Sequence, residues 1–453
     1  MHTPIQNAIF YHIYPLGFCG APQQNDPFAK PVSRLNKITT WLDHIQNLEF
    51  NSLYLGPVFE STRHGYDTVD YYHIDRRLGT DADMAALSEE VHSRGMNLVF
   101  DGVFNHVGRD FWAFKDVLAN GESSPFHDWF ANLRFNGRSP YGDPFTYDGW
   151  NGHYELVKLN LKNPQVKDHL FFAIESWMQD YRIDGIRLDA ADQLDMEFNE
   201  ELAEFCKRRN PDLWLMGELI HGDYAKWVRP GRYDSCTNYE CYKGLFSSFN
   251  DRNLFEIAYS LKRQFGEFGL YQNLLLYSFA DNHDVDRVTS QLKDPSDLFN
   301  LYTLLYTIPG IPSIYYGSEW GIAGRKENGS DDPLRPNLDL HTSIDSAPQP
   351  DLPDHLKRLA FIRAELSALR TGNYQQVLVA SLQFAFQREL DGSKVLVAVN
   401  ASDKTEEIIL SNRQASNGCW VDLLNPGVEW TAQGEQTVLI LPPKWSRILV
   451  LKP

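Results

Sequence analysis

The stretch GIRLDAAD, residues 185–192, has the hydrophobic composition of a buried strand but carries two charged residues. Successive side chains of a strand point to opposite faces, so Arg187 and Asp189 share one face while Ile186 and Leu188 share the other. Burying a charged pair costs free energy unless the charges are paired or used. Taken alone, this pair is equally consistent with a structural ion pair and with a pair of residues in a functional site. Other parts of the sequence distinguish the two.

Strand and helix patterns alternate from the N-terminus to residue 373. Thr80 is a capping residue before a helical pattern that Gly95 ends, and Asn163–Pro164 opens another helix. Strands that alternate with helices form a parallel sheet, and a series of this length favours a closed barrel. The predicted fold class is therefore α/β, with a (β/α)8 TIM barrel. Strand-like runs include AIFYHIYPLGF (8–18), NSLYLGPVF (51–59) and MNLVFDGVFNH (96–106).

Two segments depart from this alternation. Residues 107–158 are rich in Gly, Pro, Asn and aromatic residues and are too long for an ordinary loop, so we expect a small inserted domain after strand 3. From residue 374 the segments are short and β-rich, and Asp391–Gly392 is a hairpin signal, which predicts a C-terminal antiparallel β-sandwich. The predicted domains are a barrel of residues 1–106 and 159–373, an inserted domain of residues 107–158 and a C-terminal domain of residues 374–453.

The composition restricts the partners and the compartment. The chain has 453 residues and a net charge of −18, so nucleic acid or an anionic membrane would be repelled. No window approaches the roughly 18 apolar residues of a membrane span, and the first residues lack the pattern of a signal peptide. The 5 cysteines are scattered without metal-ligand spacing, which favours reduced thiols and a cytoplasmic protein.

The ends of four predicted strands carry charged or polar side chains. In an α/β barrel the carboxyl ends of the strands form one rim, where active sites lie. Carboxylates in close company suit glycoside hydrolysis, in which one carboxylate acts as nucleophile or base and one carboxylic acid donates a proton. Crowding raises the pKa of at least one carboxyl group, and a nearby arginine keeps another ionised. The residues at these ends are Asp101, Asn105, His106, Arg187, Asp189, Glu218, His283 and Asp284.

The motifs at these strand ends resemble the ordered sequence regions of the α-amylase family of glycoside hydrolases. The segments GYDTVDYYHID (65–75) and IPSIYYGSEWG (311–321) extend the resemblance over nearly the whole chain. It implies a retaining α-glucan enzyme on a (β/α)8 barrel, with a small domain after the third strand and a final β-domain. The four motifs are DGVFNH (101–106), GIRLDAAD (185–192), GEL (217–219) and FADNHD (279–284).

The resemblance implies roles for four residues in the reaction. Asp189 resembles the nucleophile that forms a covalent glycosyl intermediate, and Glu218 resembles the general acid/base. Asp284 resembles the third carboxylate, which binds sugar hydroxyls and stabilises the transition state. Arg187 resembles the residue that positions the nucleophile. No cofactor is required for this chemistry.

Five further residues are implied in substrate binding. His106 and His283 resemble the hydroxyl-binding histidines, and Tyr66 in HGYD resembles the aromatic platform under the same sugar. Asp101 supports the hydrogen bonding of the site rather than performing chemistry. His221 in GELIH resembles a residue typical of the cyclomaltodextrinase, neopullulanase and maltogenic amylase group.

The same group is indicated by ELVKLNLKNPQV at 155–166. Secreted α-amylases commonly have Lys-His where this chain has Asp192–Gln193, so the acceptor side of the site differs. Members of the group usually carry an extra N-terminal β-domain, which we expect this chain to lack, and this leaves the oligomeric state open. The oligo-1,6-glucosidase branch of the family uses an Asp in DNGYD to hold a non-reducing end, but this chain has RHGYD at 63–67. This difference argues against an exo-glucosidase.

Three functions remain open at this point. The first is a hydrolase of α-1,4-glucosidic bonds in α-glucan oligosaccharides, either maltooligosaccharides or cyclodextrins. The second is a transglycosylase of the same fold, and the third a non-catalytic carbohydrate-binding protein. A structural calcium ion is possible, with Asn105 as one oxygen ligand and no identified partners, although calcium takes six to eight oxygens.

Overall fold

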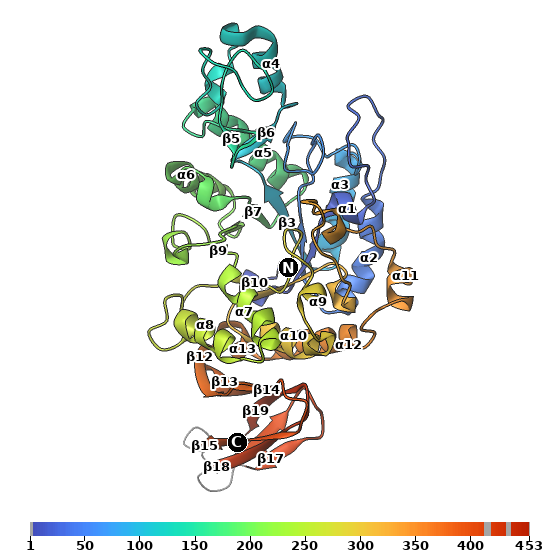
Figure 1. The fold of residues 1–453 in the computed structure, drawn as a ribbon, viewed down its shortest axis with the longest axis vertical. Helices are drawn as coiled ribbons and strands as arrows, with labels where there is room; N and C mark the ends of the chain where they lie inside the picture. Colours follow the sequence, from blue (N-terminus) through green and yellow to red (C-terminus); the bar gives the residue numbers. More distant parts are fainter. Residues whose placement is uncertain (1–2, 412–417, 432–435, 453) are drawn as a thin grey trace.

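The computed structural model describes residues 3–411, 418–431 and 436–452. Its centre is a sheet of parallel strands in the order β10-β11-β1-β2-β3-β7-β8-β9 (Figure 1). A parallel bridge between Thr237 and Tyr277 joins the two edges of this sheet, which confirms the predicted (β/α)8 barrel. The strands are β1 (Phe10–Ile13), β2 (Ser52–Leu55), β3 (Asn97–Gly102), β7 (Gly185–Leu188), β8 (Trp214–Gly217), β9 (Ser235–Cys236), β10 (Tyr277–Phe279) and β11 (Ile311–Tyr315).

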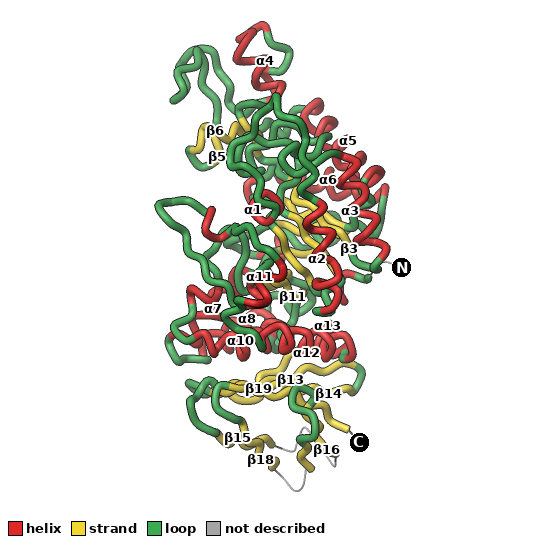
Figure 2. The backbone as a smooth tube through the Cα atoms, turned by 90° about the vertical axis from the view of Figure 1, so that its right-hand side faces the viewer, coloured by secondary structure: helices red, strands yellow, loops and turns green. Residues whose placement is uncertain are grey.

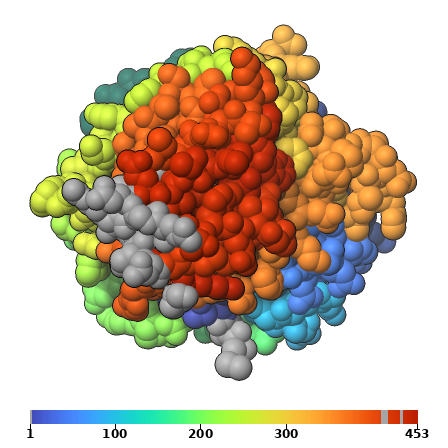
Figure 3. Space-filling view, turned by 90° about the horizontal axis from the view of Figure 1, so that it is seen from below, coloured from blue at the N-terminus to red at the C-terminus, as the bar shows by residue number. Residues whose placement is uncertain are grey.

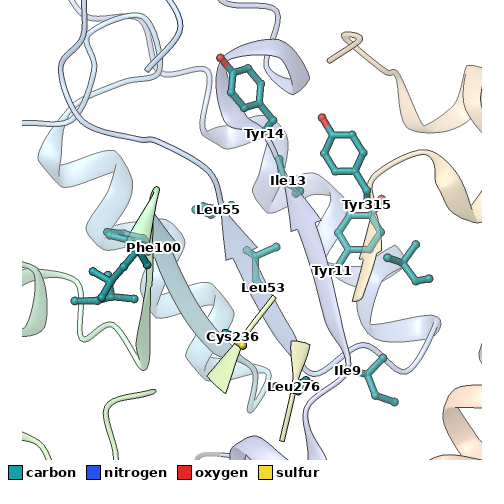
Figure 4. Close-up of a cluster of buried hydrophobic side chains, with 14 of the residues drawn as sticks. Ile9, Tyr11, Ile13, Tyr14, Leu53, Leu55, Phe100, Cys236, Leu276 and Tyr315 are labelled. Atoms are coloured by element: carbon teal, nitrogen blue, oxygen red, sulfur yellow. The ribbon is translucent and has the colours of Figure 1, made fainter. Parts of the chain in front are cut away.

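Each barrel strand has one face toward the barrel interior and one toward the surrounding helices. Phe10 and Tyr54 pack together inside the barrel. Tyr11 and Leu53, each one residue away, belong to the layer between strands and helices, which Figure 4 shows in close-up. Ile186 and its neighbour Leu188 lie in this outer layer too, so the alternation predicted for 185–188 is confirmed.

Helices cover the outer face of the barrel, and two of them have the predicted boundaries. Thr80 forms a capping box with Asp83, and Gly95 follows the end of that helix with a φ of 71°. Asn163 accepts a hydrogen bond from the backbone of Gln165, with proline at the next position. The longer helices around the barrel are α2 (Asn36–Asn47), α3 (Asp81–Ser93), α5 (Pro164–Asp180), α6 (Met196–Arg209), α7 (Tyr239–Asn250), α8 (Phe255–Phe265), α10 (Leu298–Thr307) and α12 (Leu352–Glu365).

Shorter helices complete the barrel region. Among the described residues, none of the helices has the length and hydropathy needed to span a bilayer. The short helices are α1 (Pro15–Phe18), α9 (Val288–Gln291), α11 (Leu340–Asp345) and α13 (Ser367–Thr371).

The segment after β3 forms a compact insertion at one end of the long axis of the molecule (Figure 1). It contains a three-stranded antiparallel sheet in the order β4-β6-β5, one α-helix and two short 3-10 helices. The exact domain boundaries stay a prediction. The elements are β4 (His106–Gly108), α4 (Trp112–Asn120), β5 (Gly149–Trp150) and β6 (His153–Lys158).

The C-terminal strands lie at the opposite end, beneath α10, α12 and α13, as Figure 2 shows. They form a six-stranded antiparallel sheet and a two-stranded sheet, and Ala398, Ile408 and Leu439 pack between the two, as in the predicted sandwich. Seen from that end, these strands cover the middle of the molecule (Figure 3). They are β12 (Asn373–Val379), β13 (Gln383–Leu390), β14 (Ser393–Asn400), β15 (Glu406–Ser411), β16 (Cys419–Asp422), β17 (Glu429–Thr431), β18 (Gln436–Leu441) and β19 (Trp445–Lys452).

The predicted hairpin at Asp391–Gly392 is confirmed. Leu390 pairs with Ser393, so Asp391 and Gly392 alone connect β13 to β14. Asp391 and Gly392 have positive φ angles of 50° and 81°, as a two-residue hairpin turn requires.

Candidate active site

Arg187 lies at the centre of a buried group of carboxylates on three adjacent strands. Its Nη1 donates to both carboxylate oxygens of Asp101, at 2.8 and 3.0 Å, and to Oδ1 of Asp189 at 3.0 Å. Its Nη2 lies 2.8 Å from Oε1 of Glu218. The parallel register of β3, β7 and β8 places the carboxyl ends of these strands side by side. One guanidinium therefore holds three carboxylates.

Asp101 is the most enclosed of the three carboxylates, with 1% of its surface exposed. Its Oδ2 accepts hydrogen bonds from the hydroxyls of Tyr54 at 3.1 Å and Tyr66 at 2.9 Å, besides the Arg187 contact. A carboxylate whose oxygens are already occupied by buried donors is suited to orienting its neighbours. It is poorly placed to reach a ligand itself.

Asp284 is bound by partners on two sides. Its Oδ2 lies 3.0 Å from Nε2 of His283, and its Oδ1 accepts from Nη2 of Arg335 at 3.1 Å. His283 also contacts the hydroxyl of Tyr66, whose ring stacks on the imidazole with 5.6 Å between centroids. Arg335 is held in turn by Asp331 at 3.0 Å. The Asp284 carboxylate is thus fixed by a chain of contacts that reaches the Tyr66 ring.

The pKa values of Asp189 and Glu218 are both raised. Burial is the main cause for the Asp189 pKa, with repulsion from Glu218 and Asp101 adding to it, while Arg187 opposes the shift. Burial also raises the pKa of Glu218, and Asp284 adds to it against Arg187 and the backbone N–H of Ala190. Because the two carboxyls share one guanidinium, they titrate as a pair, and loss of a proton from one raises the pKa of the other. This arrangement favours a protonated carboxyl in the pair.

The shift of Asp284 has the opposite direction. Burial raises its pKa, but His283, through charge and hydrogen bond, and then Arg335 outweigh burial, so the pKa lies well below the ordinary range. Burial lowers the pKa of His106 to about 3, so its imidazole is neutral. The amide nitrogen of Asn105 lies 3.2 Å from Nδ1 of His106, which leaves Nε2 as the donor. In the described part of the chain this Nε2 has no hydrogen-bond partner.

A cavity of about 2350 Å³ opens over this cluster. Asp101, Arg187 and His283 lie behind its wall, so the structure places them as supports rather than as lining. His221 lies at the exposed rim and has no hydrogen bond to the carboxylates among the described residues. The predicted site residues that line the cavity are Tyr66, His106, Asp189, Glu218, His221 and Asp284.

The aromatic residues of the insertion divide between its own core and the cavity. Phe145 and Tyr147 are buried in that core. Tyr141 and Trp150 line the cavity, and the Trp150 ring lies 5.5 Å from the imidazole of His106. The insertion therefore contributes one aromatic wall.

Sequence reasoning missed three residues of this site. Arg335 and Tyr14 both line the cavity, and the Arg335 guanidinium packs 4.4 Å from the centre of the Tyr14 ring. Arg335 comes from an irregular loop, so no periodic pattern points to it. His12, on β1, stacks on Tyr54 at 4.2 Å, and burial lowers its pKa well below the ordinary value. The sequence could have indicated His12, because it is a polar residue near the end of a predicted strand.

Asn105 is still the one candidate ligand for the calcium ion that the sequence leaves open, and this ion stays a prediction. The Oδ1 of Asn105 is buried without a hydrogen-bond partner in the described ranges. Within the same ranges, however, no three His, Cys, Asp or Glu side chains come together as a metal site. A single amide oxygen falls far short of the six to eight oxygens that calcium takes.

Comparison with known proteins gives the class of the molecule. The family described as "Alpha amylase, catalytic domain" matches residues 12–377. The chain therefore belongs to the α-amylase family of glycoside hydrolases, and the prediction of a glycosidase is confirmed.

Its relatives agree with the group predicted from the motifs. A cyclomaltodextrinase from a Bacillus species is 31% identical over 87% of this chain and 73% of that protein. Neopullulanase 2 of Thermoactinomyces vulgaris is 30% identical over 98% of this chain and 77% of that protein. An α-amylase structure from Anoxybacillus has a TM-score of 0.84 and 26% identity, covering 100% of this chain and 99% of that one.

Proposed function

We propose that this enzyme hydrolyses α-1,4-glucosidic bonds of maltooligosaccharides and cyclodextrins with retention of configuration. The observation that carries the proposal is the contact of one guanidinium, that of Arg187, with both Asp189 and Glu218. Retaining glycosidases need their two carboxyl groups only about 5–5.5 Å apart. Sharing one guanidinium supports so short a separation.

In the proposed reaction Glu218 donates its proton to the glycosidic oxygen while Asp189 attacks the anomeric carbon. The bond to the leaving sugar breaks, and a glycosyl ester forms on Asp189. Glu218, now ionised, takes a proton from water, which attacks the same carbon and releases Asp189. The raised pKa of Glu218 suits a proton donor, and the low pKa of Asp284 keeps a negative charge beside the positive transition state.

Substrate contacts follow from the lining of the cavity. We assign Tyr66 as the floor under the reacting sugar and Nε2 of His106 as a donor to a sugar hydroxyl, because both line the cavity. The names of the cyclomaltodextrinase and neopullulanase relatives support oligomeric α-glucans as substrates. We also place the enzyme in the cytoplasm, which the five free thiols support.

Product analysis tests the proposal. Maltoheptaose and β-cyclodextrin are incubated with the enzyme, and chromatography follows the products while proton NMR follows the anomer released first. We expect maltose and glucose as products, the α-anomer first, and higher specific activity on maltohexaose than on soluble starch. A preference for starch would contradict the substrate, and initial release of the β-anomer would contradict retention. Transfer products longer than the substrate would identify a transglycosylase.

A further inference from the structure

The cavity over the carboxylates continues beyond them along α7 and α8. Ile220, two residues after Glu218, belongs to its lining and is 46% exposed. From there the lining passes Tyr242 and Lys243 on α7 and reaches Tyr259 on α8. The two helices pack against each other, as Figure 1 shows, so this lining is one continuous surface opposite the insertion.

Tyr259 is the outstanding side chain of this surface because 70% of it is exposed while it lines the same cavity as the carboxylates. Single exposed aromatic residues are common on protein surfaces and need no explanation. Tyr259 differs from them in its surroundings. Arg263, one turn further along α8, forms an ion pair with Glu240, and Lys243 lies 3.9 Å from Glu256. The cavity lining around this exposed ring therefore carries paired polar groups of both signs.

This combination matches the chemistry of a sugar ring. A pyranose has an apolar face of C–H groups that packs on the face of an aromatic ring, and a rim of hydroxyls that both donate and accept hydrogen bonds. A flexible charged ligand would instead require an excess of one charge. Here Lys243 and Arg263 are balanced by Glu256 and Glu240.

We propose that Tyr259, with Ile220 beside the carboxylates, forms a remote platform that binds glucose units of an α-glucan beyond the bond being cleaved. The proposal rests on the proposed function and extends it, since it assigns a wall that selects for longer chains. We expect a substrate of two or three units held at the carboxylates to gain little from this wall, and a chain of seven units to contact it.

Binding to an inactive variant tests the platform without turnover. In a Glu218→Gln background, the dissociation constant for maltoheptaose is measured by calorimetry with and without Tyr259→Ala. The matched control is Phe172→Ala, because Phe172 on α5 is 55% exposed but does not line the cavity. Steady-state kinetics in the otherwise wild-type enzyme then compare maltoheptaose with maltotriose.

We expect Tyr259→Ala to weaken maltoheptaose binding by about three- to tenfold, as loss of one aromatic contact would, and to lower the ratio of kcat/KM for maltoheptaose over maltotriose. Phe172→Ala should change neither quantity. Equal dissociation constants for the parent and Tyr259→Ala would overturn the platform while leaving the proposed function intact. If the wild-type enzyme cleaves neither maltoheptaose nor β-cyclodextrin, the proposed function itself fails.

Discussion

Two regions of the molecule bury arginine side chains. Arg187 is buried at the rim of the barrel, and Arg363 on α12 and Arg388 on β13 are buried near the C-terminal sheet. The two regions differ in the groups that these arginines contact. Arg187 contacts three carboxylates. Arg388 donates to the carbonyls of Thr307 at 2.7 Å and Leu369 at 2.9 Å, and Arg363 binds the Leu369 carbonyl as well, at 3.0 Å. Neither has a carboxylate within ion-pair distance in the described part of the chain.

Thr307 and Leu369, whose carbonyls bind these arginines, belong to the last turns of α10 and α13, while Gly310 and Gly372 supply further carbonyls just after the two helices. The end of a helix leaves carbonyls without intrahelical partners and carries partial negative charge, so a guanidinium is stabilised there. Burial lowers the pKa of each to about 9, with repulsion from Arg370 adding to the shift of Arg363 and repulsion from Arg363 adding to that of Arg388, and both stay protonated at neutral pH. Helix ends thus neutralise these charges without ionisable groups.

The rim has the opposite balance, because three carboxylates surround one guanidinium. Burial, with repulsion from neighbouring carboxylates adding to it, raises the pKa of Asp189 and Glu218 against the opposing charge of Arg187, which favours a protonated carboxyl in this pair. The comparison leads us to expect that the buried charges neutralised by backbone carbonyls contribute to stability. We expect that the buried carboxylates of the rim serve the proposed reaction at a cost in stability.

The largest effect is expected at the rim. We expect a fall in kcat of about a hundred- to ten-thousandfold for each of three variants, Asp189→Asn, Glu218→Gln and Asp284→Asn. Circular dichroism should show that each variant is folded. Glu218→Gln should retain more activity on a glucosyl fluoride than on a maltooligosaccharide. The reason is that fluoride leaves without protonation, whereas a sugar leaving group needs a proton. Kinetics on both substrates check this. Equal losses on the two would contradict Glu218 as the acid.

A large effect on stability is expected at the C-terminal sheet. Arg388→Met removes the hydrogen bonds to the carbonyls and should lower the free energy of unfolding by about 3 kcal/mol, with activity per folded molecule retained. Urea denaturation measures this. Arg208→Met is the matched control, since Arg208 is exposed and paired with Glu204 at 3.3 Å, and should cost less than about 0.5 kcal/mol. An equal loss of unfolding free energy in the two variants would contradict a stabilising role for the buried Arg388.

The smallest expected effect is a pH-dependent gain in stability. The pKa of Glu218 is raised on folding above its usual 4.5. The folded protein therefore holds this proton more tightly than the unfolded chain, and the stability of the wild type falls as the pH rises from 4.5 through the folded pKa. Glu218→Gln should thus raise Tm at pH 8 but not at pH 4. The exposed Asp212→Asn serves as the control. A gain that is the same at both pH values would contradict a raised pKa.

Much of the rim could be predicted from the sequence because its residues stand at fixed places in strands. Asp101, Arg187 and Glu218 follow hydrophobic runs, and parallel strands bring such ends together. Arg335 could not be predicted, because its contact with Asp284 spans 51 residues and depends on an irregular loop.

The arginines near the C-terminal sheet were missed for another reason. An arginine in a helix or strand is ordinarily exposed, and nothing local to Arg363 or Arg388 indicates that helix ends from elsewhere in the chain will meet them. Tyr259 was missed likewise, since only the packing of α7 on α8 shows that it borders the cavity.

Trapping the covalent intermediate tests the central claim most directly. The enzyme is incubated with an activated fluorinated glucosyl fluoride, which forms the ester quickly and hydrolyses it slowly, and then digested for peptide mass spectrometry. The account predicts one added fluoroglycosyl group, on the peptide that contains Asp189, and none in Asp189→Asn. An intact protein that cleaves maltoheptaose yet carries no adduct, or carries it on another residue, would contradict the proposed reaction.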